Sequence, residues 1–250
     1  EGERVSQSFF ELAIELQLKH PKDFQKQWHE LLHWFGLVLA MLLSVIKYIH
    51  SIGFIHGDIK PENIIYNYET NRLALIDFNL TVSAPYTFTG RGSPTTVAPE
   101  IHGFLRGPVH FGIDWWAFGN SATIILAFGF AGILHGTVTP ELEESVAFYA
   151  PFSYNHTSKT YTMKPLPSYF PVLIRSFIYP FFSPDPSKRV FSQPGAYNWI
   201  RSHPIFRNIR DWSQYDNSST EEYESRNSSL IRGFSLFSER PVLLREIRRR

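Results

Sequence analysis

The sequence feature that most constrains the fold is a long apolar pattern between residues 27 and 50. Apolar residues recur there at steps of three and four: Leu31, Leu32, Phe35, Val38, Leu39, Leu42, Leu43, Ile46 and Ile49. This spacing places them on one broad face of an α-helix, and Gly53 follows where such a helix ends. A helix with so wide an apolar face must bury it, so the pattern predicts a domain built around a long core helix.

A second apolar stretch covers residues 114–134. Both stretches approach the roughly 20 apolar residues that are needed to cross a bilayer. The first contains His33, Ser44 and Lys47, and the second contains Asn120 and Ser121. These polar positions favour two buried core helices over two membrane spans, which remain the weaker alternative.

The remaining sequence is divided into short elements. Residues 9–19 have a helical pattern, residues 73–76 are typical of a strand, and residues 67–72 are typical of a hairpin turn. Residues 78–113 are rich in Thr, Ser, Gly and Pro, and loops of that length are usually functional or disordered. Prolines recur from 140 to 204, which predicts short helices and many loops. The sequence therefore predicts a mainly α (α+β) domain with one small β-hairpin region.

Composition excludes several classes of function. Hydrophobic residues make up 43% and charged residues 19% of the chain, which is enough apolar material for a sizeable core. The net charge of +1 gives no reason to expect nucleic acid as a partner. The chain has no cysteine, which excludes disulfides, thiolate metal sites and a thiol nucleophile. With no signal peptide at the first residues, we expect a cytoplasmic location, with the nucleus as the alternative.

One ordered set of polar residues predicts a catalytic function. Residues 56–63 read His-Gly-Asp-Ile-Lys-Pro-Glu-Asn, and an Asp-Phe-Asn sequence at 77–79 follows the predicted hairpin. Phosphoryl transfer needs an acceptor for the substrate hydroxyl proton, positive charge beside the moving phosphate, and oxygen ligands for Mg²⁺. These needs are met in order by Asp58, Lys60, and the pair Asn63 and Asp77. Singly, an Asp in a turn is usually a cap and an exposed Lys is usually solvated, but the ordered set favours phosphoryl transfer.

The same residues resemble a known family. HGDIKPEN resembles the protein-kinase catalytic loop H-R-D-L-K-P-E-N, and the Asp-Phe-Asn sequence resembles D-F-G. Three more matches follow in family order: Ala98-Pro99-Glu100 with A-P-E, residues 114–119 with D-x-W-A/S-x-G, and residues 185–189 with D-P-x-x-R. The resemblance covers about residues 9–212 and implies the large, C-terminal lobe of a eukaryotic protein kinase.

The branch of the family can be narrowed. Residues 203–212 are similar to the ending of AGC-group kinase domains, and the ribosomal-protein kinase branch is the nearest likeness. Residues 231–235 resemble the hydrophobic motif of that group's tail. The implied organisation is a large lobe over 1–212, with a catalytic loop at 56–63 and an activation segment at 77–100. A flexible polar linker at 213–229 and an AGC-like tail at 230–250 follow.

The resemblance implies roles for individual residues. Asp58 becomes the catalytic base and Lys60 the phosphate-neutralising lysine, while Asn63 and Asp77 hold Mg²⁺ and its nucleotide. Ser93 falls where serine/threonine kinases have a threonine that bridges the catalytic Asp and Lys. Two structural roles are also implied: an ion pair between Glu100 and Arg189, and support of the catalytic-loop backbone by Asp114. ATP and Mg²⁺ are the implied cofactors, and a protein is the implied substrate.

The largest departure from the family is at the start of the chain. Only 55 residues precede His56, and no G-x-G-x-x-G sequence occurs. We therefore expect the small lobe to be absent and the nucleotide site to be open on one side. An upstream kinase, or a partner that completes the cleft, is the partner this implies beyond the substrate. No membrane partner is expected.

Two substitutions lie inside the motifs. Gly57 replaces the arginine that usually binds an activation-loop phosphate. A phosphate on Thr89, which belongs to the activation segment, lacks that main partner. Activity is therefore predicted not to depend strongly on this phosphate. Asn79 replaces the glycine of D-F-G, a mild handicap because asparagine tolerates positive φ.

The predicted function is a serine/threonine protein kinase that transfers the γ-phosphate of ATP. Because the small lobe is expected to be absent, little activity is predicted for this chain alone. The alternative is a catalytically weak or inactive pseudokinase that acts as a scaffold or regulator.

Overall fold

The structure is a computed structural model of the 250-residue chain. It describes residues 3–5, 12–13, 15–16, 18–20, 22–67, 72–85, 93, 96–102, 110–135, 152–155, 157–158, 160–166, 170–183, 185–186, 189, 196–213 and 215. Thr89, the predicted tail at 230–250 and most of the predicted linker lie outside the described residues.

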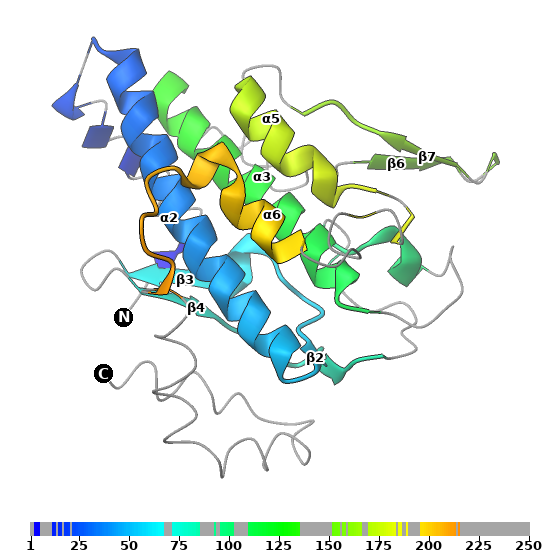
Figure 1. The fold of residues 1–250 in the computed structure, drawn as a ribbon. Helices are drawn as coiled ribbons and strands as arrows, with labels where there is room; N and C mark the ends of the chain where they lie inside the picture. The colour runs from blue at the N-terminus through cyan, green and yellow to red at the C-terminus, as the bar shows by residue number, and fades with distance from the viewer. Residues whose placement is uncertain are drawn as a thin grey trace.

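Two long helices form the centre of the domain. Helix α2 spans Phe24–Ser51 and helix α3 spans Gly112–His135, and the two pack against each other (Figure 1). The side chain of Asp23 caps the first turn of α2 by accepting a hydrogen bond from the backbone N–H of Lys26 at 3.0 Å. Gly53, with a φ of +84°, follows the end of α2 and turns the chain back. Both helices were predicted from apolar patterning, and the structure confirms them.

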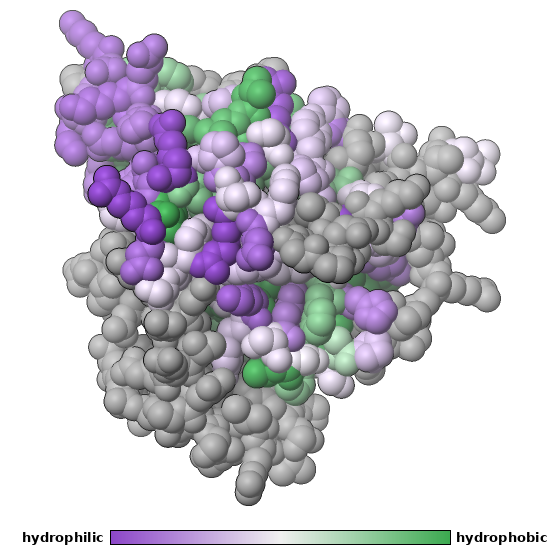
Figure 2. Space-filling view, in the orientation of Figure 1, coloured by the Kyte–Doolittle hydropathy of each residue, from purple (hydrophilic) through white to green (hydrophobic). Residues whose placement is uncertain are grey.

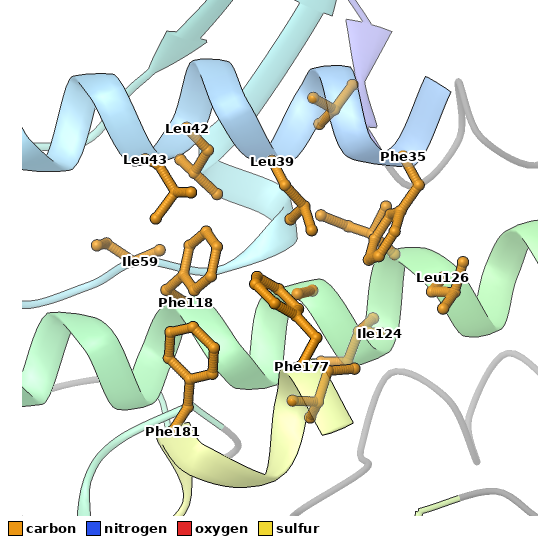
Figure 3. Close-up of a cluster of buried hydrophobic side chains, with 14 of the residues drawn as sticks. Phe35, Leu39, Leu42, Leu43, Ile59, Phe118, Ile124, Leu126, Phe177 and Phe181 are labelled. Atoms are coloured by element: carbon orange, nitrogen blue, oxygen red, sulfur yellow. The ribbon is translucent and has the colours of Figure 1, made fainter. Parts of the chain in front are cut away.

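The core lies between these helices and a shorter helical layer. Helix α5 (Val172–Ile178) runs directly into the 3₁₀ turn η3 (Tyr179–Phe181). Figure 3 shows side chains of α2 pointing toward Phe118 of α3, with Phe177 and Phe181 closing the cluster from the other side. All three aromatic side chains are fully buried. Ile59 enters the same cluster, so the core reaches directly under the predicted catalytic loop.

Short antiparallel strand pairs lie beside α2. Strand β3 (Ile64–Asn67) pairs with β4 (Arg72–Leu75), with Asn67 opposite Arg72, as the predicted hairpin requires. Strand β1 (Glu3–Arg4) adds to the other edge of β3, a pairing that was not predicted. Strand β2 (Phe54–Ile55) pairs with β5 (Val82–Ser83), which ties the residues before the catalytic loop to those after Asp77.

The C-terminal part consists of short helices, as the recurring prolines predict. In addition to α5 and η3, it contains α6 (Ala196–Ser202) and the 3₁₀ turn η6 (Pro204–Phe206). Two further 3₁₀ turns lie nearer the site, η1 (Pro61–Asn63) and η2 (Pro99–His102). The hairpin of β6 (Phe152–Asn155) and β7 (Thr160–Met163) was not predicted, and Figure 1 shows it extending away from the helices.

The surface agrees with this arrangement. Figure 2 shows hydrophilic side chains gathered over the start of α2, where Lys22, Asp23 and Lys26 are exposed. Among the described residues, α2 is the one helix long and apolar enough to cross a membrane by length and composition, and more than half of its most apolar window is buried inside the domain. The described part of the chain is mainly helical with small strand pairs. The expected absence of a small lobe stays a prediction.

Candidate active site

The predicted catalytic loop is fixed from below by one carboxylate. Asp114, in the first turn of α3, accepts hydrogen bonds from the backbone N–H of His56 at 2.8 Å and of Gly57 at 2.9 Å. The imidazole Nε2 of His50, in the last turn of α2, lies 2.8 Å from the same carboxylate. The predicted support of the loop by Asp114 is therefore present.

The surroundings of Asp114 keep it ionised. Burial alone raises the pKa of a carboxyl group, but the hydrogen bond and charge of His50 and the hydrogen bond from the Gly57 N–H hold the pKa of Asp114 below its usual value. The role of His50 was missed at the level of sequence, because it lies outside the recognised motifs. The available signal was its place at the end of a core helix, just before the loop that Asp114 supports.

Four of the predicted site residues form one hydrogen-bonded group, the Asp58 cluster: Asp58, Lys60, Asn63 and Ser93. The Lys60 ammonium donates to Asp58 Oδ2 at 2.8 Å and to Ser93 Oγ at 2.9 Å. The Ser93 hydroxyl donates in turn to Asp58 Oδ1 at 2.9 Å. Asn63 Nδ2 donates to the backbone oxygen of Asp58 at 2.8 Å and to its Oδ2 at 3.1 Å. Both oxygens of Asp58 are thus engaged by side chains.

The electrostatics of Asp58 follow from these contacts. Burial raises the pKa of its carboxyl group, whereas hydrogen bonds from Lys60, Ser93 and Asn63 and the charge of Lys60 lower it, and the balance lies below the usual value. Asp58 is 6% exposed and Lys60 is 23% exposed. The cluster therefore contains an ionised carboxylate whose neighbouring cation still reaches the surface.

The fifth predicted residue, Asp77, reaches the site through the strand register. Ile64 lies opposite Leu75, and the N–H of Ile76 donates to the backbone oxygen of Asn63 at 2.8 Å, so Asn63 and Asp77 lie at the same end of the hairpin. Asp77 has a φ of 64° and is the one non-glycine residue with positive φ among the described residues. The backbone freedom we expected to matter at Asn79 is thus required at Asp77 instead, and Asn79 carries no such strain.

The donor atoms at this end of the hairpin suit Mg²⁺. Carboxylate and amide oxygens are the ligands that Mg²⁺ prefers, and it commonly takes one or two from a protein and the rest from phosphates and water. Asn63 uses its NH₂ group for both bonds to Asp58, which leaves its carbonyl oxygen for a metal. Among the described residues, no group of three or more His, Cys, Asp or Glu side chains could hold a metal ion.

His56 is a buried residue at the start of the catalytic loop. Its side chain is fully buried, and its ring contacts the ring of Phe78 with centroids 4.8 Å apart. Its Nδ1 accepts the backbone N–H of Asp58 at 3.3 Å, which requires that nitrogen to be unprotonated. Desolvation lowers the pKa of His56, although the charges of Asp114, Asp58 and Asp77 act in the opposite direction. Asp58 and Asp77 therefore both act electrostatically on the same buried imidazole.

Gly57 has a structural reason to be glycine. Its φ is +82°, and a Cβ added there would lie 2.8 Å from the backbone oxygen of Leu80. Thr81, next to Leu80, donates from its hydroxyl to the backbone oxygen of His56 at 3.2 Å. The segment after Asp77 therefore lies close against the catalytic loop and is bonded to it by a side-chain hydroxyl, at the position where the family pattern has an arginine.

The predicted ion pair between Arg189 and Glu100 joins η2 to the start of α3. Both terminal nitrogens of Arg189 donate to the Glu100 carboxylate at 2.6 Å. The same guanidinium donates to the backbone oxygens of Ser183 at 2.8 Å and Gly112 at 3.2 Å, and it lies over the ring of Trp116. Arg189 is fully buried and Glu100 is 10% exposed, so η2 is fixed to the start of α3.

Comparison with known proteins agrees with this geometry. Residues 15–199 match the family described as protein kinase domain. The chain is 29% identical over 181 residues to the cAMP-dependent protein kinase catalytic subunit 2 of Drosophila melanogaster, covering 69% of this chain and 44% of the fly protein. It is 38% identical over 96 residues to the serine/threonine-protein kinase H1 homolog of Pinctada fucata, covering 36% of this chain and 23% of that protein.

A solved structure shows the same fold. The kinase PK-1 of Cydia pomonella granulovirus superposes with a TM-score of 0.51 at 21% sequence identity, over 69% of this chain and 58% of the viral one. The chain spans less than half the length of the curated relatives described above. The predicted likeness to AGC-type kinases is confirmed by the cAMP-dependent relatives, and the ribosomal-protein kinase branch stays a prediction.

Proposed function

The chain belongs to the protein kinase family, and from that membership we propose that it transfers the γ-phosphate of ATP to a serine or threonine hydroxyl of a protein. The observation that supports this most strongly is the Asp58 cluster. It holds an ionised carboxylate and an ammonium group 2.8 Å apart on a loop that is fixed from below by Asp114. Preorganised charge of this kind is the main contribution that a protein makes to phosphoryl transfer.

Each residue then has a part in the reaction. Asp58 accepts the proton of the attacking hydroxyl, and its lowered pKa keeps it ionised and ready to do so at neutral pH. Lys60 stabilises the negative charge of the transferred phosphate. Asn63 and Asp77 would hold Mg²⁺, which when bound neutralises charge on the phosphates.

The test is phosphorylation of a generic basic peptide by the full chain and by Asp58→Asn. A general base typically contributes 10²–10⁴-fold, so a loss of that order is expected. Asp23→Asn is the matched control, because Asp23 is an exposed cap of α2 and its replacement keeps a good capping side chain. Equal peptide phosphorylation by wild type and Asp58→Asn would refute the proposal.

The second candidate is a catalytically inactive scaffold or regulator, and the substitutions at Gly57 and Asn79 favour it. A scaffold that has lost its nucleotide site gains no stability from ATP. A site held at about a hundred times its dissociation constant adds about 2.7 kcal/mol to the free energy of unfolding. Thermal unfolding with and without Mg²⁺-ATP separates the two functions, and a clear upward shift in Tm would count against the scaffold.

A further inference from the structure

Ser121 is a buried polar residue in the middle of helix α3. Its side chain is fully buried, and most of the helix around it is apolar. Burying a hydroxyl group without a partner is unfavourable, and serine is a poorer helix former than alanine. Two residues later, Thr123 satisfies its hydroxyl within the helix by donating to the backbone oxygen of Gly119 at 2.9 Å. Ser121 instead donates to a group outside the helix.

The partner of Ser121 belongs to the catalytic loop. The hydroxyl donates to the backbone oxygen of Ile59, which directly follows Asp58 in the chain, at 3.5 Å. Ile59 is fully buried, so its carbonyl group has no access to water and needs a donor from the protein. The bond is long for an O–H···O contact, so its free energy is modest. Its importance therefore depends on what it holds in place.

Three residues on one face of α3 contact the catalytic loop in turn. Asp114, Phe118 and Ser121 are separated by four and three residues, which places them on the same side of the helix. Asp114 accepts from the backbone N–H of Gly57 at 2.9 Å. Figure 3 shows Phe118 in the buried cluster that contains Ile59, and Ser121 bonds to the backbone oxygen of Ile59. Helix α3 therefore holds the main chain both before and after the proposed base.

We propose that Ser121 is a positioning residue that fixes the direction of the Asp58 carboxylate for proton transfer. The inference rests on the proposed function, because it assigns a part in that reaction. Asp58 follows Gly57, whose φ of +82° belongs to a residue type with wide backbone freedom, so its direction also depends on how Ile59 is held. A displacement of about 1 Å can cost a large part of the rate, because the base must stay within hydrogen-bond reach of the attacking hydroxyl.

The effect should appear in turnover and not in substrate binding. Among the described residues, Ser121 acts on the Asp58 cluster through Ile59 and forms no bond to the cluster itself. The full chain and Ser121→Ala are compared in phosphorylation of a basic peptide, with urea unfolding of the same samples to express kcat per folded chain. Loss of one modest hydrogen bond should lower kcat by roughly two- to tenfold. The KM values for peptide and for ATP should not change.

Two further variants identify the cause. Ser44 is a buried serine of the other core helix, α2, and its hydroxyl has no hydrogen-bond partner among the described residues. Ser44→Ala is therefore the matched control, and it should leave kcat at the wild-type value. Ser121→Cys fills the place of the serine with a group that is only a weak donor. If the hydrogen bond matters and not the packing, its kcat should stay near that of Ser121→Ala.

Amide hydrogen exchange reads the position of the loop directly, because local opening is measured segment by segment. In Ser121→Ala, the peptide that covers residues 56–60 should exchange faster by roughly two- to tenfold, as one lost hydrogen bond implies. Exchange in α2 and in the β3–β4 hairpin should not change. Ser44→Ala should leave the exchange of residues 56–60 at the wild-type rate.

The outcomes separate the inference from the proposed function. Wild-type turnover with an equal kcat in Ser121→Ala overturns the inference and leaves the proposed function standing. A return to the wild-type kcat in Ser121→Cys assigns the effect to packing and overturns it too. So does a loss that appears in KM, or a lower kcat with unchanged exchange of residues 56–60. Absence of peptide phosphorylation by the wild-type chain overturns both.

Discussion

Two carboxylates belong to the same site, Asp114 below the catalytic loop and Asp58 within it, and their hydrogen-bond partners differ in kind. Asp114 is 1% exposed and accepts from two backbone N–H groups as well as His50. Asp58 is 6% exposed, yet the donors to its carboxylate are side chains. A backbone donor cannot leave without moving the chain, whereas a side chain can rotate away. Nearly equal burial therefore gives one acid that fixes structure and one that can exchange partners, as a reaction requires.

The residues that fix structure are Asp114, Glu100 and Arg189, here called the anchoring residues. Asp114 and Arg189 are bonded to backbone groups and Glu100 is bonded to Arg189, whereas Lys60 in the Asp58 cluster retains 23% exposure. If this distinction is physical, removal of an anchoring residue should reduce stability, and removal of a residue of the Asp58 cluster should mainly reduce activity.

The largest effect is expected for Arg189→Ala. The change leaves the Glu100 carboxylate without its partner at a 10% exposed position, and it removes the contacts to Ser183 and Gly112. Breaking a buried ion pair from one side costs about 3–5 kcal/mol. Urea unfolding measures it, and Lys19→Ala is the control because Lys19 is 65% exposed in its pair with Glu30 and should cost at most about 1 kcal/mol. Similar losses for the two variants would contradict the distinction.

The direct comparison is Asp114→Asn with Asp58→Asn. An amide at 114 cannot accept from His56 N–H, Gly57 N–H and His50 together, so we expect a loss of about 2–3 kcal/mol of unfolding free energy. Asp58→Asn should cost less than about 1 kcal/mol, because Lys60 reaches the surface and Asn63 keeps its bond to the backbone oxygen of residue 58. Paired urea titrations measure both. A loss for Asp58→Asn as large as that for Asp114→Asn would place Asp58 among the anchoring residues.

A third prediction concerns the contact that holds the activation segment. Gly53 and Gly57 have nearly equal φ angles of +84° and +82°, so alanine brings similar backbone strain at either position. Only at Gly57 does the added Cβ meet a backbone oxygen, that of Leu80 at 2.8 Å, whereas nothing lies within 4 Å at Gly53. Gly57→Ala should therefore cost about 1–2 kcal/mol more than Gly53→Ala. Equal costs in urea unfolding would show that Leu80 moves freely.

These comparisons also show what the sequence could predict. Helices α2 and α3 could be predicted because their apolar spacing depends on the local chain alone. The β3–β4 hairpin could be predicted from its turn, and its register brings Asn63 to Asp77. The four residues of the Asp58 cluster were all named beforehand, because they lie within recognisable motifs.

The features that the sequence could not predict depend on contacts between distant segments. The approach of Leu80 to Gly57 requires the β2–β5 pairing to be known, and the positive φ of Asp77 rather than Asn79 depends on how the hairpin ends. The β6–β7 hairpin was missed because recurring prolines dominated the interpretation of that region. Its sequence offered a signal, since Phe152 and Tyr154 precede a short polar sequence and Thr160, Tyr161 and Thr162 follow it, and these residue types favour strands.

The smallest predicted effect is on the dependence of stability on pH, and it concerns the buried imidazole of His56. Burial lowers the pKa of His56 below 6.5, so below that pH the unfolded chain binds a proton that the folded chain does not. The stability that this residue contributes is fully present above pH 6.5 and is lost as the pH falls toward the lowered pKa, at up to about 1.4 kcal/mol per pH unit. The pKa of His203 is lowered too, by burial, so it adds to the same slope.

Urea unfolding between pH 7.5 and 5 should show a slope that decreases in His56→Gln and is unchanged in His29→Gln, whose side chain is exposed. An undiminished slope in His56→Gln would mean that folding does not lower the pKa of this imidazole, which would contradict its burial as a neutral group.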